Sequence, residues 1–371
     1  MSRNTTYEEL TADAFESLLV SANGNKVSDE NLIVTESLGL SWGELSRKQF
    51  TNTEKILFGL MRGNVGSLFA VTNLGKTTLS LNICLSIAAG RIFEPFVKGF
   101  HGGRRVMVID GESTQYELKA DFQRMMQDWS PEERGLVERN LHILCDEEID
   151  DEPLNLSDPR HMKAITEAAC GFQPDLIVVD TLSALFNLKS ENDNAEIKMV
   201  VMQPLKKLAK DANAAVLLLH HVGKQNEDGR TSVGAYAGRG GSAIGALSRS
   251  VALLKIDAQD PERIVFSVPK AKGYRLEPLL MRLDHEARWF IPTNEAVTPR
   301  PTSYELVVST VKSCGEPVKR KEIDATLKGE ISVATIGRNL EEAVSRGDLI
   351  NPKYGFYAAP ENTQPPEDYG F

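Results

Sequence analysis

Between residues 55 and 292, short apolar runs alternate with longer amphipathic stretches. Several of these runs are rich in valine, isoleucine and leucine without polar alternation, which is typical of strands buried on both faces. The runs that we expect to form strands span 67–71, 106–110, 141–145, 176–180, 215–220, 251–256 and 264–268. The expected helices span 77–89, 114–128, 160–170 and 194–213. This alternation predicts an α/β fold in which a parallel sheet is flanked by helices.

Both ends of the chain differ from this central pattern. Residues 1–54 are polar and mixed, and we expect them to form an N-terminal extension or arm. After a proline-containing break near residue 300, three helices are expected at 303–313, 319–327 and 332–346, followed by a short hairpin. This order, over residues 302–358, is typical of a small C-terminal winged-helix-like domain. Residues 359–371 are proline-rich and acidic, which predicts a disordered tail.

Composition narrows the class of protein. The 371 residues carry a formal net charge of -10, which argues against a nucleic-acid-coating surface but permits a local basic groove. No apolar run approaches the roughly 20 residues needed to cross a bilayer, and the N-terminus lacks a signal pattern. The four cysteines lack the short spacing of a zinc site. We therefore expect a soluble, cytoplasmic protein without membrane partners.

A phosphate-binding loop is predicted where the first apolar run leads into a helix. Such a loop needs backbone N–H groups around the phosphates, a lysine for the outer phosphates and a hydroxyl for magnesium. The residues expected to contact the nucleotide are Asn73, Leu74, Gly75, Lys76, Thr77 and Thr78. Ala70 stands where the motif usually has its first glycine. If Ala70 needs a positive φ, the loop would be strained and would bind nucleotide more weakly.

Carboxylates follow two of the predicted strands. Because the carboxyl ends of parallel strands meet at one edge of a sheet, these acids are expected beside the loop. Asp180 suits contact with magnesium together with Thr77, and Glu112 suits a general base that orients the attacking water. Asp110 is the main rival for the base. The alternative is that each acid caps the helix that follows it.

The strand at 215–220 leads into a paired histidine, and His221 is a candidate sensor of the γ-phosphate. Metal binding by the pair is disfavoured because adjacent strand residues face opposite sides. The long segment that follows is rich in glycine, serine and charge, so Lys224 and Arg230 are candidate DNA contacts.

Arg239 lies between glycines in that segment, as expected for an arginine that reaches the site of a neighbouring subunit. Lys270 and Lys272 follow a late strand and are candidates for the same kind of trans contact. The alternatives are an ordinary solvated arginine and a solvated basic turn.

Taken together, these motifs resemble RepA-type hexameric replicative helicases of plasmids and the wider RecA-like ATPases. The resemblance covers about residues 55–275 and includes the Glu-Asn-Asp-Asn-Ala sequence at 191–195, the histidine pair and the Arg-Gly-Gly-Ser-Ala sequence at 239–243. It implies that residues 55–295 form a RecA-like P-loop NTPase core. It also implies a homohexameric ring, ATP with Mg²⁺, and single-stranded DNA in a central channel. By the same resemblance, Glu112 is the base, His221 the sensor and Arg239 the finger.

The C-terminal segment offers a second candidate DNA site. If it is a winged helix, its third helix would present Thr335, Arg338, Asn339 and Arg346 to a major groove, with Lys353 on the wing. Nearby acids balance these charges, so a protein-interaction or ring-packing role is equally consistent. The acidic tail is a candidate segment for docking on a partner protein.

Two functions therefore remain open at this point. The first is an ATP-driven ring motor on single-stranded DNA, a replicative helicase of a plasmid, phage or mobile element. The second is a regulatory or scaffold ATPase that binds DNA or a partner through its C-terminal domain without unwinding.

Overall fold

The computed structural model describes residues 39–49, 54–145, 148–149, 152–221, 241–257, 259–297 and 301–362. The chain divides into two compact units, Met1–Thr51 and Asn52–Phe371. In the first unit, helix α2 (Trp42–Arg47) begins with a capping box between Ser41 and Glu44, and none of its residues is buried. The rest of the predicted arm and the tail beyond residue 362 lie outside the described residues. None of the described helices is long and apolar enough to span a membrane.

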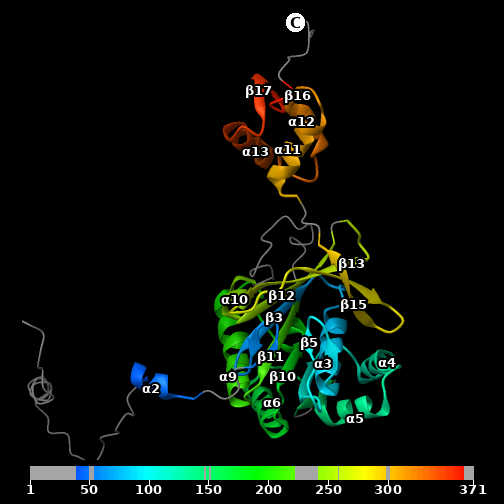
Figure 1. Ribbon diagram of the computed structural model, residues 1–371. Coiled ribbons are helices and arrows are strands. Elements are labelled where there is room, and N and C mark those ends of the chain that lie inside the picture. Colours follow the sequence, from blue (N-terminus) through cyan, green and yellow to red (C-terminus); the bar gives the residue numbers. More distant parts are fainter. Residues whose placement is uncertain are drawn as a thin grey trace, which may run out of the picture. The chain divides into compact units, whose positions relative to one another are not determined.

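A mixed sheet forms the centre of the second unit (Figure 1). Its strands are β3 (Val65–Ala70), β6 (Val106–Asp110), β7 (Leu141–Cys145), β10 (Leu176–Asp180), β11 (Ala215–His221), β12 (Ser250–Ile256), β13 (Arg263–Ala271), β14 (Leu279–Asp284) and β15 (Trp289–Ala296). Their order across the sheet is β15-β14-β13-β12-β3-β11-β10-β6-β7. Each neighbouring pair of strands from β12 to the β7 edge is parallel, as the sequence predicts. These strands are β12, β3, β11, β10, β6 and β7. The remaining three strands are antiparallel, and β14 and β15 were not predicted.

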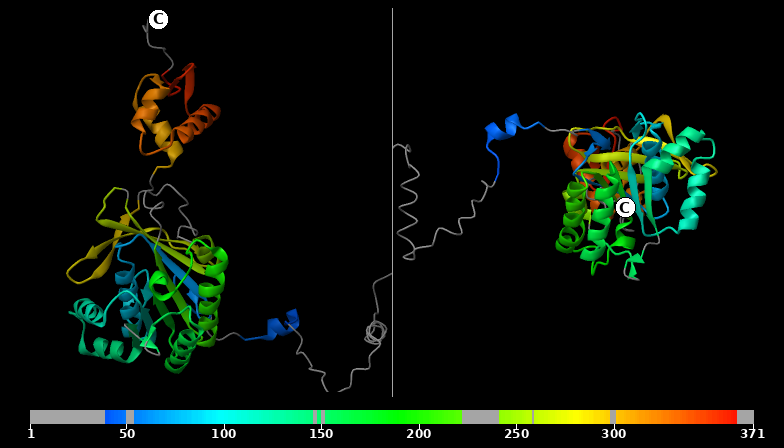
Figure 2. Two further views of the ribbon diagram at one scale, coloured as in Figure 1. Left: turned by 180° about the vertical axis from the view of Figure 1, so that it is seen from behind. Right: turned by 90° about the horizontal axis from the view of Figure 1, so that it is seen from below.

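Helices cover both faces of the sheet. One face carries α3 (Lys76–Ala89), α4 (Gln115–Met125) and α5 (Pro131–Asn140); the other carries α6 (Pro159–Phe172), η2 (Ile197–Met202), α9 (Gln203–Asp211) and α10 (Gly241–Leu247). The strands serve both layers, because successive side chains point to opposite faces. Leu217 packs into the first core and Leu218 into the second. The two helical layers are seen from behind and from below in Figure 2.

Two of the predicted helices differ from those observed. The helix expected at 114–128 ends at Met125, and α5 follows it with its own capping box between Ser130 and Glu133. Helix α5 was missed because Val137 is its only buried residue, so it has almost no apolar stripe. The helix expected at 194–213 is three consecutive segments, α8 (Asn194–Glu196), η2 and α9.

Helix α3 connects the phosphate-loop region to the antiparallel strands. Every residue of α3 except Thr77 is buried, so the helix is enclosed on all sides although it contains polar residues such as Ser80 and Asn82. Within it, Asn82 donates its amide to the carbonyl of Arg288 at 3.0 Å and accepts the backbone N–H of Phe290 at 2.9 Å. These two bonds fix the start of β15 against the helix that begins at the loop.

The C-terminal residues have a hydrophobic core of their own, which includes Val307, Ile323 and Leu340. The elements are α11 (Ser303–Ser313), β16 (Val318–Lys319), α12 (Arg320–Thr326), α13 (Val333–Arg346), β17 (Ile350–Lys353) and β18 (Phe356–Ala358). The three strands form an antiparallel sheet in the order β16-β18-β17. The three helices lie close to their expected positions, whereas β16 was not predicted.

Candidate functional site

The loop between β3 and α3 has the backbone shape that an anion site needs. Ala70 is the last residue of β3, is fully buried and pairs in register with His221. Positive φ angles fall instead on Asn73 (62°) and Gly75 (80°). The strain considered for Ala70 is therefore absent. Gly75 is required for a second reason, since a Cβ there would lie 2.8 Å from the Phe290 ring.

The start of α3 leaves its backbone amides available. Its N-cap, Gly75, makes no side-chain capping hydrogen bond, and Lys76 follows as the first helical residue. Lys76 is only 4% exposed. Burial lowers the pKa of the Lys76 ammonium, and the charges of Asp180 and Glu112 partly oppose this. A helix N-terminus and a desolvated lysine thus converge on one place, which suits a phosphate group.

His221 connects Lys76 to Glu112. The Nζ of Lys76 lies 2.8 Å from His221 Nδ1, and His221 Nε2 lies 3.3 Å from Glu112 Oε1. The hydroxyl of Thr181 donates to the same Glu112 oxygen at 2.7 Å. These residues come from α3, from β11 and from the segments after β6 and β10. They meet because all these strands are parallel and end at the same edge.

The electrostatics favour an ionised Glu112. Its hydrogen bond with His221 lowers the pKa of the Glu112 carboxyl most; partial burial raises it, and the Thr181 bond lowers it further. The Glu112 side chain is 41% exposed, so water can reach it. An ionised, solvent-accessible carboxylate has the properties of a general base.

Asp110 has a different place from Glu112. One of its oxygens accepts the backbone N–H groups of Glu112 and Ser113, both at 2.8 Å. Asp110 therefore shapes the turn that presents Glu112, which resembles the capping alternative considered for these acids. Asp110 is 3% exposed, so water has little access to it. Of the two candidates for the base, the geometry favours Glu112.

Asp180 is suited to a divalent cation. Its side chain is 1% exposed, and burial raises its pKa to about 7, with a hydrogen bond from Thr77 acting in the opposite direction. Its Oδ1 has no hydrogen-bond partner among the described residues. A buried carboxylate oxygen without a partner, beside a hydroxyl at the start of α3, fits the oxygen ligands that Mg²⁺ prefers.

The structure thus brings Lys76, Thr77, Glu112, Asp180 and His221 into one site. Of the other expected nucleotide contacts, Asn73 is exposed on the loop, Leu74 packs against the core, and Thr78 is buried in α3.

The remaining predicted contacts lie elsewhere. Lys224, Arg230 and Arg239 fall outside the described residues. Lys270 donates to the carbonyl oxygens of Gly245 and Ala246 at the end of α10, at 2.7 and 2.9 Å, so it is tied within its own subunit.

Two threonines of the site were not identified from the sequence. Thr181 orients Glu112, and the hydroxyl of Thr72 lies 3.3 Å from His221 Nδ1. The signal for Thr181 is its position directly after the last acid of a buried strand. Thr72 has no such signal, because its contact depends on the register of β11 against β3.

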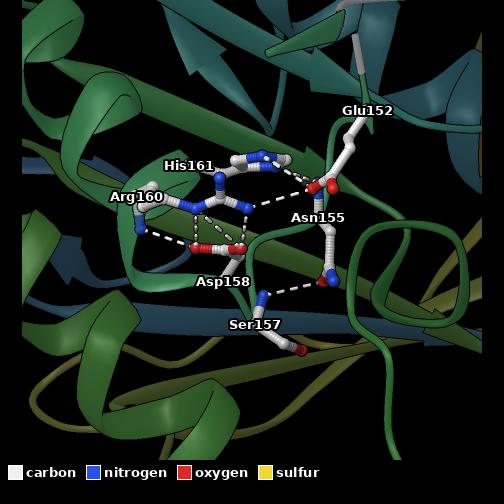
Figure 3. Close-up of polar contacts among 6 residues, drawn as sticks. All are labelled: Glu152, Asn155, Ser157, Asp158, Arg160 and His161. Carbon is white, nitrogen blue, oxygen red and sulfur yellow. Dashed lines mark hydrogen bonds and ion pairs between the residues drawn. The ribbon is translucent and has the colours of Figure 1, made fainter. Parts of the chain in front are cut away.

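A second polar cluster lies at the start of α6 (Figure 3). Glu152, Asp158 and His161 are close enough to hold a cation, but two observations oppose it. Arg160 already bridges the two carboxylates, at 3.0 Å from Glu152 and 2.8 Å from Asp158. In addition, His161 Nδ1 accepts the backbone N–H of Asn155 at 3.0 Å, so Nε2 carries the proton of the neutral ring. The cluster fastens the segment before α6 and is not a metal centre.

A family model matches the part of the chain that contains the phosphate-binding loop. The family described as AAA domain (AAA_25) matches residues 35–227, slightly more than half of the chain. A KaiC-like protein of the hyperthermophilic archaeon Pyrococcus horikoshii is similar in structure over 64% of this chain and 93% of that one, with 14% identity and a TM-score of 0.46. A structure titled as an ATPase domain is similar over 63% of this chain and 86% of its own, with 13% identity and a TM-score of 0.46. No curated protein matches the sequence significantly.

Proposed function

We propose that this chain, which belongs to the AAA domain family (AAA_25), has a RecA-like core and is an ATP-hydrolysing ring motor on single-stranded DNA. Its setting would be the replication of a plasmid, phage or mobile element, with the protein acting as a DNA helicase. The observation that carries the proposal is the hydrogen-bonded series Lys76–His221–Glu112. It links a phosphate-binding lysine to a base through one imidazole.

Each residue of the site has a defined task in ATP hydrolysis. The amides at the start of α3 and Lys76 bind the phosphates, while Thr77 and Asp180 would hold a magnesium ion, which would supply positive charge to neutralise them. Glu112 orients the attacking water and accepts its proton. Thr181 keeps the Glu112 carboxylate in position through its hydroxyl.

His221 is suited to sensing the γ-phosphate. It contacts Lys76 on one side and Glu112 on the other, so a phosphate that draws Lys76 away must change both contacts. It is also the last residue of β11, directly before the segment with Lys224 and Arg230. We propose that this segment carries contacts to the DNA strand.

A ring requires contacts between copies. We propose Arg239 as the arginine that reaches a neighbour's nucleotide, with Lys272 as a further trans candidate and six copies in the ring. Lys270 is less suited to this role because the end of α10 holds its ammonium. Mixing Arg239→Ala with Lys76→Ala subunits tests the trans arrangement: recovered hydrolysis supports it, and its absence at every ratio contradicts it.

The C-terminal elements support a winged-helix assignment, with α13 as the third helix and β17–β18 as the wing. Arg338 and Lys353 are both exposed and remain candidate DNA contacts. Asn339 is wrong as a contact, because its side chain is buried against the domain core. Arg346 is engaged with Glu342 and lies over the Tyr304 ring.

The second candidate function, a regulatory ATPase that does not unwind DNA, is favoured by this charge pairing. On the C-terminal domain, Arg346 pairs with Glu342 and Arg320 with Asp324, so fewer cations remain for phosphates. A forked-duplex unwinding assay with ATP separates the two functions. Unwinding that disappears in Lys76→Ala and Glu112→Gln supports the helicase; hydrolysis without strand separation supports the regulator.

A further inference from the structure

A hollow of about 580 Å³ lies at the edge of the sheet opposite the phosphate-binding loop. Its lining includes Val65, the first residue of β3, whereas the loop follows Ala70, the last residue of that strand. The hollow is therefore separate from the ATP site. Five cationic side chains line it: Lys206, Lys210, Arg249, Lys270 and Lys272. We refer to it as the basic hollow.

Within the described part of the chain, no acid balances the charge of the basic hollow. None of its five cations forms an ion pair with an acid among the described residues, and the neighbouring Asp211 is paired with Lys207 outside it. The pKa of Lys270 is lowered mainly by burial, and further by the positive charges of Lys206 and Arg249. Burial and the charge of Lys210 likewise lower the pKa of Lys206. In a chain of net charge -10, such mutual repulsion is relieved by an anionic ligand.

The arrangement of the cations suits a linear ligand with one charge per unit. Lys206 and Lys210 are one turn apart on α9, which places their Cβ atoms about 6 Å from each other. Lys270 is the last residue but one of β13, and Lys272 follows the strand directly, in a turn. Successive phosphates of a nucleic-acid strand have a comparable separation, whereas those of a triphosphate lie much closer together.

We propose that the basic hollow binds the phosphates of a single nucleic-acid strand, with Lys206, Lys210 and Arg249 as its contacts. Lys270 holds the end of α10 through Gly245 and Ala246 and so fixes the wall of the hollow. The proposal rests on the proposed function in one respect only, namely that the anionic polymer is a nucleic acid. The ATP site at the other edge plays no part in it.

The test compares two double variants of the full chain with equal net charge. Lys206→Ala/Lys210→Ala removes two cations from the hollow; Lys163→Ala/Lys207→Ala removes two exposed cations, each 76% exposed and each in an ion pair within its own helix. Alanine favours helix, so both variants should fold. Binding of a labelled oligothymidylate of about 20 nucleotides is measured by fluorescence anisotropy across a salt series.

The hollow variant should bind the strand at least about tenfold more weakly at 0.1 M salt, and its slope of log affinity against log salt should fall by about 1.4. The control variant should stay within about twofold of the wild type. Arg249→Gln, a single change, should lower the slope by about 0.7.

An affinity and slope unchanged in the hollow variant overturn the proposal. The proposal is also overturned if the hollow variant binds the strand normally but hydrolyses ATP poorly. That result would indicate that the hollow contacts the nucleotide of a neighbouring copy. Absence of strand binding in the wild type also overturns it. Failure of the proposed function has a different signature, namely a wild type that binds the strand through the hollow and hydrolyses no ATP.

Discussion

At the scale of single residues, the site depends on side chains that the sequence places far apart. Lys76, Glu112 and Asp180 were predictable, because a lysine after a loop glycine and acids at the ends of buried strands meet at one edge of a parallel sheet. The hydrogen bonds of His221 were not predictable. They require the register that sets His221 opposite Ala70, which sequence patterns do not specify.

Removing the Thr181 hydroxyl should impair the base without weakening nucleotide binding. A hydrogen bond to a charged group of this kind contributes about 1.5 kcal/mol or more, so Thr181→Ala should lower kcat about tenfold with little change in KM. The bond lowers the pKa of Glu112, so its loss raises that pKa. The acid limb of the pH–rate profile should therefore move to higher pH. Thr181→Ser keeps the hydroxyl and is the control; an unmoved limb in the alanine variant would contradict this role.

Asp180 should reduce the stability of the magnesium-free protein at alkaline pH. Its pKa in the folded state, about 7, lies above the ordinary aspartate pKa of about 3.9, so the folded state binds the proton more tightly. Stability from this group is present at low pH and is lost as pH rises from about 4 through 7. Asp180→Asn should thus be more stable at pH 8, by on the order of a few kcal/mol, and should hydrolyse no ATP. Urea unfolding of the wild type and Asp180→Asn at pH 5 and pH 8, with a chelator present, measures the difference in unfolding free energy. The same increase in stability at both pH values would contradict the prediction.

At the scale of secondary structure, most elements with a strong apolar signal were found, although β14 was missed despite its run of apolar residues. Strands β6 and β10 are apolar runs that are buried throughout, and α3 buries every residue except Thr77. Helix α5 buries only Val137, and β15 contains Pro292 and several polar residues, so neither has a clear period. Their places are set by tertiary contacts, such as those of Asn82 with the start of β15.

Asn82 should couple protein stability to nucleotide affinity. Asn82→Ala leaves the Arg288 carbonyl and the Phe290 N–H without their partner, which should cost about 2 kcal/mol or more of unfolding free energy. Phe290 also lies against Gly75, so the loop should bind ATP more weakly. The matched control is Asn140→Ala, which removes two amide bonds, to Ala88 and Gly102, at the far end of α3. Denaturation measures the unfolding free energy of both variants, and nucleotide titration measures their affinity for ATP. If Asn82→Ala and Asn140→Ala lose ATP affinity equally, the loss reflects general destabilisation and contradicts a specific coupling through Asn82.

At the scale of the whole molecule, the mixed sheet with its helices and the C-terminal elements have separate hydrophobic cores. The C-terminal cluster contains only residues from Val307 to Leu349, with partly buried neighbours of the same segment, and neither cluster of the sheet includes a residue of it. Two cores of this kind are expected to fold independently. The mostly parallel core was predictable from periodicity, whereas the antiparallel extension was not.

Truncation after Val297 should therefore leave ATP hydrolysis within about twofold of the full chain, because no site residue or core contact is lost. If the C-terminal domain binds duplex DNA, the truncated chain should lose duplex affinity while keeping its affinity for single strands, and Arg338→Ala/Lys353→Ala in the full chain should reproduce part of that loss. Steady-state hydrolysis and anisotropy with duplex and single-stranded probes provide the comparison. A truncated chain that is folded by circular dichroism but hydrolyses ATP far more slowly would show that the C-terminal domain regulates the motor. In that case the two cores are separate in folding but coupled in function, and the regulatory ATPase becomes the better description.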